Sequence, residues 1–344
     1  MNEATHDGNP PAGPRGAHHF RFRDLLHRLF SMANQGYLRL EFLQMAAGSM
    51  LELLACDVLE VRLEDAGKVY RCRASLGEGV SRCLCDAPPD PASLTDQIMD
   101  AVLHGRLLAA SPFSTRGGSF WTGDAARPVL VREPARRDAL PRSLVLGGEH
   151  LSVAFVPIPV DERVRGVLYL GGRKADSFTR DDIPFFETVA ETLGVAVAFQ
   201  GAQWALRERV KELDCLYGIA QVAQHSRLAM DEQIAAIAQL LPPAWQYPEL
   251  TLARVTLDGR AHATPGFKAT PWLQSAEIRV AGKVRGSVEV AYDREMPQFD
   301  EGPFLQEERS LIEEIARQVG LIVERQEDEK AKAQLFHMLE QRRE

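Results

Sequence analysis

Two stretches of the chain repeat one hydrophobic pattern, in which a short strand containing Val-Arg-Gly leads through a polar turn into a long amphipathic helix. The first copy has its strand at residues 164–170 and its helix at 181–200, and the second copy has them at 284–290 and 307–326. Short apolar runs are typical of strands, and apolar residues three and four positions apart are typical of helices. A recurring pattern of this kind indicates a duplicated structural unit. The sequence therefore predicts two copies of one kind of domain.

Similar elements precede the repeated strand in both copies. In the first copy the pattern predicts helices at residues 20–30 and 37–54, and strands at 58–63, 69–74 and 151–160. In the second copy it predicts a helix at residues 230–241 and strands at 250–257 and 275–280. Strand pairs separated by short turns favour antiparallel sheets. The predicted fold class is α+β, with two domains that each contain an antiparallel sheet flanked by helices.

The two copies differ in one long stretch. Residues 75–149 of the first copy are rich in Gly and Pro, and only residues 94–108 show a helical pattern, whereas the second copy has no such insertion. Irregular stretches of this length are uncommon in compact domains and are usually functional or disordered. We therefore expect the insertion of the first copy to be the place where a ligand binds.

A helical linker is predicted between the copies. Apolar residues follow the alternating spacing of a coiled-coil seam, and charged residues surround them. The seam consists of Leu206, Val210, Leu213, Tyr217 and Ala220. We expect this helix to continue from the helix at 181–200 and to form a homodimer, together with Ile312, Ile315 and Val319 of the closing helix. Whether the two chains run parallel or antiparallel is left open by the pattern.

The composition argues against several classes of protein. The 344 residues carry a formal charge of -8, which gives no general attraction to nucleic acid or to anionic membranes. No apolar run is long enough to cross a membrane. The 5 cysteines are odd in number and scattered, which argues against a disulfide framework and favours a reducing compartment. We expect a cytoplasmic protein that binds no nucleic acid and does not insert into a membrane.

These patterns define a set of domain boundaries. They are a disordered tail at residues 1–19, a first domain at 20–203 with the insertion at 75–149, a coiled-coil linker helix at 204–226, a second domain at 227–326 and a charged C-terminal helix at 327–344. The tail is rich in Gly, Pro and Asn and lacks the apolar segment of a secretory signal.

Several motifs of the first copy carry a family resemblance. The strand Phe155-Val156-Pro157-Ile158, the strand at 164–170 and Phe178-Thr179 before the closing helix resemble a GAF domain. The resemblance covers residues 25–200. It implies a pocket between the sheet and the insertion, in which members of this family hold small ligands, nucleotides, haem or tetrapyrroles.

The second copy resembles a more particular module. Residues 209–219, 241–248 and 299–308 are similar to the GAF-like segment that lies upstream of bacterial histidine kinases and of proteins similar to phosphoenolpyruvate synthase. Only a charged helix follows residue 324. The resemblance therefore implies either that the chain acts on a separate partner, such as a histidine kinase or a phosphotransfer enzyme, or that it is a truncated sensory region.

The candidate ligand contacts lie in the insertion. Phe113, Phe120 and Trp121 stand among glycines, where aromatic side chains suit an adaptable pocket, although they would equally suit a lid packed on the sheet. His104 or His150 is the candidate haem ligand. Cys83 and Cys85 are the candidate metal ligands, but a C-x-C pair without a second pair does not predict a metal site. No motif identifies a cofactor or a catalytic residue.

We therefore expect a non-enzymatic sensory or regulatory protein. An effector or partner would bind the first domain, and helical dimerisation would relay the event to a separate output protein. The alternative is a scaffold subunit of an enzyme complex that binds no small ligand. An enzyme that uses Cys83 or Cys85 is a third class, which mutation of these residues would test.

Overall fold

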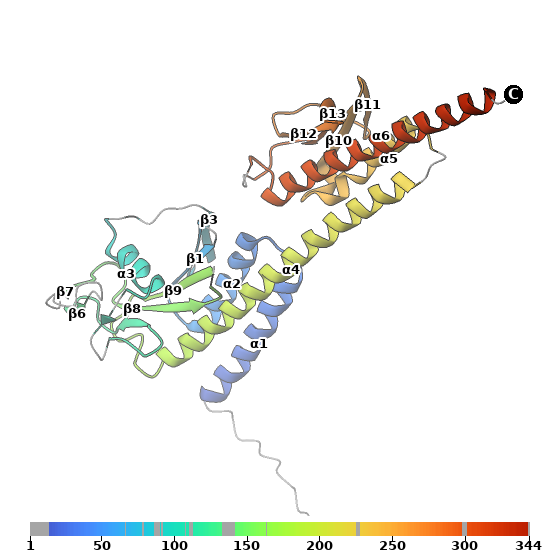
Figure 1. Ribbon diagram of the computed structural model, residues 1–344. Coiled ribbons are helices and arrows are strands. Elements are labelled where there is room, and N and C mark those ends of the chain that lie inside the picture. Colours follow the sequence, from blue (N-terminus) through green and yellow to red (C-terminus); the bar gives the residue numbers. More distant parts are fainter. Residues whose placement is uncertain are drawn as a thin grey trace, which may run out of the picture. The chain divides into compact units, whose positions relative to one another are not determined.

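The computed structural model describes residues 14–65, 67–77, 79–85, 90, 92–106, 108–109, 113–132, 142–162, 164–224, 228–297 and 301–342. The chain divides into two compact units, Met1–Trp204 and Ala205–Glu344 (Figure 1). This division lies close to the predicted boundary at residue 203. No helix among the described residues combines the length and the apolar character that a membrane span requires.

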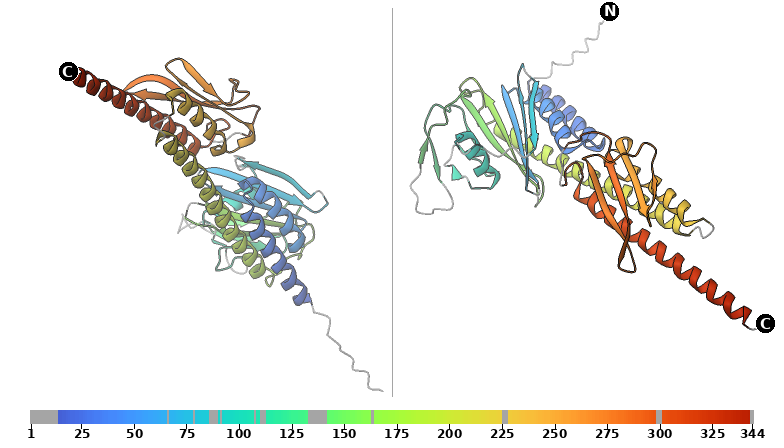
Figure 2. Two further views of the ribbon diagram at one scale, coloured as in Figure 1. Left: turned by 90° about the vertical axis from the view of Figure 1, so that its right-hand side faces the viewer. Right: turned by 90° about the horizontal axis from the view of Figure 1, so that it is seen from above.

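The first unit is built on a six-stranded antiparallel sheet with the strand order β3-β2-β1-β9-β8-β5. The strands are β1 (Val58–Asp65), β2 (Lys68–Ser75), β3 (Gly79–Cys85), β5 (Phe120–Thr122), β8 (Ser152–Pro159) and β9 (Val164–Gly172). Three helices cover one face, here called the helical face: α1 (Pro14–Asn34), α2 (Arg39–Leu54) and the first part of α4 (Ile183–Gln224) (Figures 1 and 2). Helix α3 (Leu94–Leu103) covers the opposite face, here called the α3 face.

Strand β1 shows why both faces of this sheet are covered. Successive side chains of a strand point to opposite faces. Leu59, Val61 and Leu63 lie in the core of the helical face, whereas Val58 lies in the core of the α3 face. Residues 58–63 are all buried, as expected for a central strand between two layers.

The N-terminal helix is longer than the sequence pattern predicted. α1 begins at Pro14, so residues 14–19 are helical and do not belong to a disordered tail. Residues 1–13 lie outside the described residues. Phe22 packs on the core of the helical face, and its ring lies 5.9 Å from that of Phe185 on α4.

The insertion at 75–149 is more ordered than expected, because its described parts complete the sheet. β3 pairs with β2 at one edge, and β5 pairs with β8 at the other edge. A separate three-stranded sheet has the order β4-β6-β7, with β4 at Leu108–Ala109, β6 at Val129–Arg132 and β7 at Arg142–Leu144. Only α3 was predicted, because strands of two to seven residues are too short to show a clear period.

α4 is one continuous helix that includes both the predicted closing helix and the predicted linker. It approaches the sheet most closely at Gly194, where an added Cβ atom would lie 1.9 Å from the carbonyl oxygen of Pro159. Only glycine permits this approach, because any other residue would place its Cβ atom against the backbone. The close contact fixes the depth at which α4 packs on the helical face.

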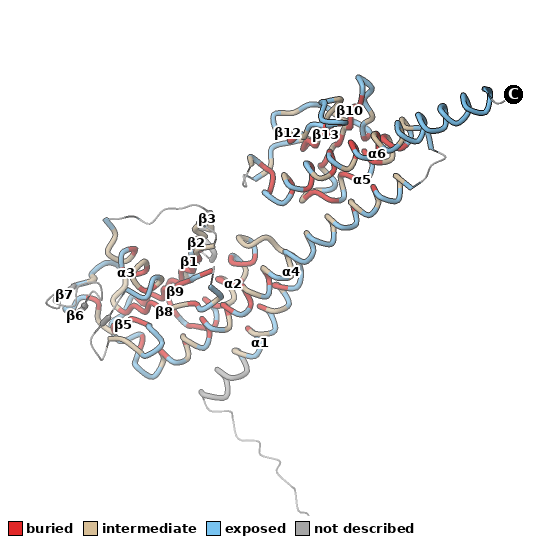
Figure 3. Tube along the Cα trace, in the orientation of Figure 1, coloured by how far each residue is buried: buried red, intermediate tan, exposed pale blue. Residues whose placement is uncertain are grey.

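The second unit contains a four-stranded antiparallel sheet with the order β11-β10-β13-β12. Its strands are β10 (Thr251–Leu257), β11 (Arg260–Ala263), β12 (Leu273–Val280) and β13 (Lys283–Tyr292). Helix α5 (Met230–Leu240), helix α6 (Gln306–Gln341) and the last part of α4 supply the residues that pack on one face of this sheet. α6 runs on beyond the unit's core, and its described side chains from residue 327 onward are all exposed (Figure 3).

The two units share their central strand order. β2-β1-β9-β8 of the first unit corresponds to β11-β10-β13-β12 of the second. Two glycines recur at equivalent places. Gly166 on β9 packs against β1, and Gly286 on β13 packs against β10. Gly194 on α4 approaches the carbonyl of Pro159 on β8, and Gly320 on α6 approaches that of Arg279 on β12. The predicted α+β class, with antiparallel sheets and a long helix, is confirmed.

Candidate functional site

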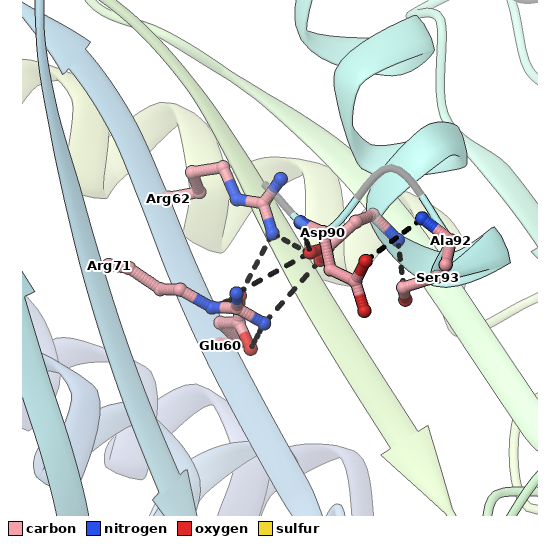
Figure 4. A network of polar contacts seen from close by, with 7 residues as sticks. Glu60, Arg62, Arg71, Asp90, Ala92 and Ser93 are labelled. Carbon is pink, nitrogen blue, oxygen red and sulfur yellow. Dashed lines mark hydrogen bonds and ion pairs between the residues drawn. The ribbon is translucent and has the colours of Figure 1, made fainter. Parts of the chain in front are cut away.

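Four charged side chains meet on the α3 face of the first unit (Figure 4). Glu60 and Arg62 come from β1, Arg71 from β2 and Asp96 from the first turn of α3. Arg62 Nη2 donates hydrogen bonds to Asp96 Oδ1 at 2.5 Å and to Glu60 Oε1 at 3.3 Å. Arg71 Nε lies 2.6 Å from Glu60 Oε1, and Arg71 Nη2 lies 3.4 Å from Asp96 Oδ1. We call these four residues the arginine–carboxylate network.

Strand register and a helix cap position this network. Arg62 lies directly opposite Arg71 in the β1–β2 pair, so the two cations need carboxylates beside them. Ser93 caps α3 by accepting a hydrogen bond from the Asp96 backbone N–H at 3.3 Å. The Asp96 carboxylate also accepts a hydrogen bond from the backbone N–H of Asp90 at 2.7 Å.

The network is almost fully withdrawn from solvent. The side chains of Glu60, Arg62 and Asp96 are 4%, 3% and 3% exposed, and that of Arg71 is 27% exposed. Burial alone would raise the pKa of Asp96, but the Asp90 hydrogen bond and the contact with Arg62 outweigh burial and lower it. Two cations thus balance two anions. The arrangement suits ion pairing between sheet and helix rather than proton transfer at neutral pH.

The sequence pattern did not single out these four residues. The available signal was the pair Glu60 and Arg62, which alternates with apolar neighbours inside a predicted strand. A charged residue in a strand that is covered on both faces needs a partner, because burying an unpaired charge is costly. That inference requires knowing that α3 covers the second face, which the pattern of β1 alone does not reveal.

An apolar cluster fills the rest of the α3 face. It contains Phe120, Phe155 and Tyr169, whose rings follow one another at centroid distances of 5.8 Å and 5.1 Å. Of the predicted ligand contacts, Phe120 is fully buried in this cluster and Phe113 packs against it. The structure thus brings two of the predicted residues together.

The other two predicted contacts lie elsewhere. Trp121 follows Phe120 on β5 and therefore points to the opposite face, where it packs on the helical-face core. His104 is the C-terminal cap of α3, and its ring nitrogens lie 3.2 Å from Asp100 and 3.4 Å from Glu64. The four residues do not form one pocket, and ligand binding by any of them stays a prediction.

A second polar contact joins the insertion to α4. Glu187 on α4 accepts hydrogen bonds through one oxygen, Oε1, from the hydroxyls of Thr115 at 2.5 Å and Ser119 at 2.6 Å. An added Cβ atom on Gly117 would lie 2.8 Å from the same oxygen, so a side chain there would displace the carboxylate. We call this contact the Glu187 latch.

The N-terminal region holds α4 further along its length. Arg39 Nη1 donates a hydrogen bond to the carbonyl oxygen of Val197 at 3.0 Å, and Arg39 Nη2 lies 3.0 Å from Asp65 Oδ2. Gln200 Nε2 donates a hydrogen bond to the carbonyl oxygen of Tyr37 at 2.8 Å. α4 is therefore tied to β1 and α2 as well as to the insertion.

The predicted seam residues of α4 lie at the surface of the second unit. Leu206, Val210, Leu213 and Tyr217 are 58%, 47%, 54% and 66% exposed. Ala220 is also exposed. These five side chains form one apolar stripe on the helix, which we call the α4 stripe.

The predicted seam residues of α6 are placed differently. Ile312, Ile315 and Val319 are 0% exposed and belong to the core of the second unit, where they pack on its sheet. They therefore cannot form an intermolecular seam. The apolar spacing was read correctly as one face of a helix, but that face covers a sheet within the same unit.

A disulfide is present, although the odd and scattered cysteines argued against a disulfide framework. Cys72 on β2 and Cys83 on β3 form a disulfide. These two residues are direct partners in the β2–β3 pair, so the strand register places them opposite each other. Cys83 is therefore engaged and is not a free metal ligand. The side chain of Cys85 lies outside the described residues.

Residues 91–198 match the model of the GAF domain family. The first unit contains a GAF domain. The match includes the insertion from α3 onward, β8, β9 and the first part of α4, whereas the resemblance expected from the motifs covered residues 25–200. It does not extend to the second unit, whose resemblance to the segment upstream of histidine kinases stays a prediction. No curated protein sequence matches the chain.

Solved structures that resemble the chain are distant. The phycoerythrobilin-bound GAF domain from a cyanobacterial phytochrome is 12% identical, with 53% of this chain and 96% of that chain covered at a TM-score of 0.36. Bacteriophytochrome RpBphP3 from the photosynthetic bacterium R. palustris is 10% identical, with 93% of this chain and 79% of that chain covered at a TM-score of 0.48. Likeness at this level carries no argument about a ligand of this chain.

Proposed function

We propose that this chain is a non-catalytic sensory or regulatory protein. Its first unit binds a small effector or a partner on the insertion side, and α4 relays the event through helical dimerisation to a separate output protein. The observation that carries the proposal is that one continuous helix, α4, is anchored in the first unit and also carries the α4 stripe. The helix forms part of the first unit's core, carries the Glu187 latch to the insertion, and continues into the segment with the α4 stripe.

The relay begins at contacts that an effector would disturb. A ligand that moves the segment with Thr115 and Ser119 changes the hydrogen bonds on Glu187. Because Gly194 fixes α4 against the carbonyl of Pro159, a rigid helix has few ways to respond other than rotating or sliding about that point. Such a movement alters the angle at which the α4 stripe is presented.

The second unit acts in this proposal as a GAF-like relay domain without a sensor site. Its strand order and its two close-packed glycines parallel those of the first unit. It lacks a counterpart of α3 among the described residues, and polar residues such as Arg254 and Glu289, which lie 2.5 Å apart, occupy the outer face of its sheet. The output partner, a histidine kinase or phosphotransfer enzyme, would dock on the exposed end of α6.

A scaffold subunit that binds no small ligand is the second candidate. It is favoured by the burial of apolar side chains on the α3 face, where Phe120, Phe155 and Val167 are at most 1% exposed. An effector would have to displace α3 or bind beside it.

Native mass spectrometry of the purified full-length chain, together with its absorption spectrum, separates these candidates. The sensory proposal expects a stoichiometric small molecule that is lost on denaturation, or a thermal shift when members of a metabolite panel are added. A chain that carries no small molecule, shows no thermal shift and co-purifies stoichiometrically with an enzyme would contradict it and support the scaffold.

A further inference from the structure

The disulfide sits at the outer edge of the first unit's sheet. β3 is an edge strand and pairs only with β2 among the described strands. The β2–β3 register shifts between Arg73 and Ala74, so the ladder is interrupted close to the disulfide. The Cys72–Cys83 bond closes this hairpin with a sequence separation of 11. This bond covalently holds β3, an edge strand that otherwise pairs on one side only and through an irregular ladder.

The two sulfurs differ in access. Cys72 is 0% exposed, whereas Cys83 is half-buried at the margin of the helical-face core. A reductant therefore reaches Cys83 first. Cys56 and Cys215, whose side chains are described, do not compete, because burial raises the pKa values of both to about 12, which keeps these thiols protonated at neutral pH.

A single edge disulfide beside buried free thiols differs from a structural framework. Disulfide-dependent domains use several bonds to replace a small core. This unit has extensive cores on both faces of its sheet and keeps Cys56 as a free thiol. The bond therefore does not compensate for a missing core. What distinguishes it from such structural disulfides is its redox chemistry.

The disulfide is also adjacent to the arginine–carboxylate network. Arg71 precedes Cys72 on β2 and points to the opposite face, where it contacts Glu60 and Asp96. A change in how β2 is held at Cys72 is thus transmitted one residue along the backbone to a side chain that binds α3. Strand β2 therefore links the redox state of the Cys72–Cys83 pair to the position of α3.

We propose that Cys72 and Cys83 form a reversible thiol–disulfide switch that controls the docking of β3 and, through Arg71, the hold of the sheet on α3. A dithiol reductant supplies the two electrons. One of its thiolates attacks Cys83 Sγ and forms a mixed disulfide, and the Cys72 thiolate leaves and takes up a proton. The second thiol of the reductant then displaces the Cys83 thiolate, which is protonated, and the reductant departs as its own disulfide.

Hydrogen–deuterium exchange of the full-length chain tests this proposal. The oxidised form is prepared with an excess of oxidised glutathione and the reduced form with dithiothreitol, and peptide mapping after alkylation verifies the Cys72–Cys83 link. Reduction is expected to accelerate exchange in residues 79–85 by roughly tenfold or more, since the closed hairpin loses its covalent constraint. A smaller acceleration is expected in residues 94–103.

Two variants sharpen the result. Cys83→Ala is expected to exchange like the reduced wild-type chain under both conditions. Cys85→Ala, which removes a thiol from the same strand, is expected to retain the full redox response. The proposal is overturned if peptide mapping links a different pair, if dithiothreitol leaves the bond intact in the folded chain, or if reduction changes neither segment.

Discussion

Glu308 is buried, and its carboxyl has the most strongly shifted pKa among the described carboxylic acids of the second unit. Its side chain accepts hydrogen bonds from the backbone N–H groups of Gln246 at 2.7 Å and Leu305 at 2.8 Å, and from the Tyr292 hydroxyl at 3.3 Å. Burial raises the pKa of this carboxyl to about 7, and nearby Glu208 on α4 adds to the rise, while the hydrogen bonds oppose it. The acid joins α6 to β13 and to the loop before β10.

This pKa predicts a pH-dependent stability of the second unit. Because the folded-state pKa of Glu308 lies above the ordinary value of 4.5, folding favours the protonated form. The contribution is present below pH 4.5 and is lost as the pH rises toward 7, with a total of about 3 kcal/mol. Hydrogen exchange in α6, corrected for the intrinsic pH dependence of exchange, is expected to show less protection at pH 8 than at pH 5.

Glu308→Gln supplies the control for that measurement. The amide does not titrate, so protection in α6 is expected to lose most of its change between pH 5 and pH 8. An unchanged pH dependence in the variant would assign the effect to other groups.

The arginine–carboxylate network gives a second prediction at the scale of residues. Arg62→Met leaves Glu60 and Asp96 to share Arg71 and is expected to destabilise the first unit by roughly 3–5 kcal/mol, because one partner of a buried ion network has been removed. Arg127→Met is the matched control, since Arg127 is 83% exposed and pairs with Asp124, and its effect is expected to stay below about 1 kcal/mol. Urea unfolding measures both, and similar midpoints for the two variants would contradict the account.

Single residues were the hardest feature to predict from the sequence. The aromatic residues Phe120 and Trp121 were read as one group, yet neighbours on a strand point to opposite faces and these two lie in different cores. The error arose because β5 spans only three residues, Phe120–Thr122, and was not recognised as a strand. Glu187 carries no local signal of Thr115 and Ser119. The pair Glu60 and Arg62 likewise gives no sign of Asp96, which lies on α3.

At the scale of elements, the packing of α4 depends on Gly194. Gly194→Ala is expected to destabilise the first unit by about 2 kcal/mol or more, because the added methyl group overlaps the Pro159 carbonyl. Gly201→Ala lies on the same helix, and its nearest neighbour is the side-chain end of Arg39 at 3.0 Å rather than a backbone atom, so it is expected to cost less than Gly194→Ala. Thermal unfolding compares the two, and equal effects would show that the close approach is unimportant.

The Glu187 latch predicts a coupling between two elements. Ser119→Ala together with Thr115→Val removes both hydroxyls and is expected to increase hydrogen exchange at the start of α4, around residues 183–190. Thr192→Val is the control, because the Thr192 hydroxyl bonds only to the carbonyl of Thr188 within the helix. If the double variant and the control exchanged alike, the insertion would not be coupled to α4 through this contact.

Elements with long periodic patterns were predicted well, whereas short strands were not. α2, α5 and the strands β1, β8, β9 and β10 lie close to their predicted ranges. The described strands of the insertion were missed because Gly and Pro divide them into short runs. α4 was predicted as a closing helix that continues into the linker, and α6 as a helix that continues into a charged segment, and each is one continuous helix.

At the scale of the whole molecule, the prediction rested on the repeated sequence pattern. The two units have the same central strand order and glycines in corresponding close approaches, while their being two copies of one domain stays a prediction. The repeat could not reveal which apolar helix faces pack internally. Ile315 and Leu213 have similar spacing patterns, yet Ile315 is 0% exposed and Leu213 is 54% exposed. The two residues differ in exposure because α6 packs on a sheet at Ile315, whereas no such layer covers Leu213 among the described residues.

Sedimentation of the full-length chain at micromolar concentration tests the relay most directly. In the proposed relay the α4 stripe is an apolar coiled-coil seam, and burial of such side chains contributes roughly 1.5 to 3 kcal/mol each. The wild-type chain is expected to sediment as a dimer and Leu213→Asp as a monomer, while Glu212→Lys, beside the stripe, is expected to remain dimeric. A monomeric wild-type chain, or a dimer that Leu213→Asp leaves intact, would contradict the account.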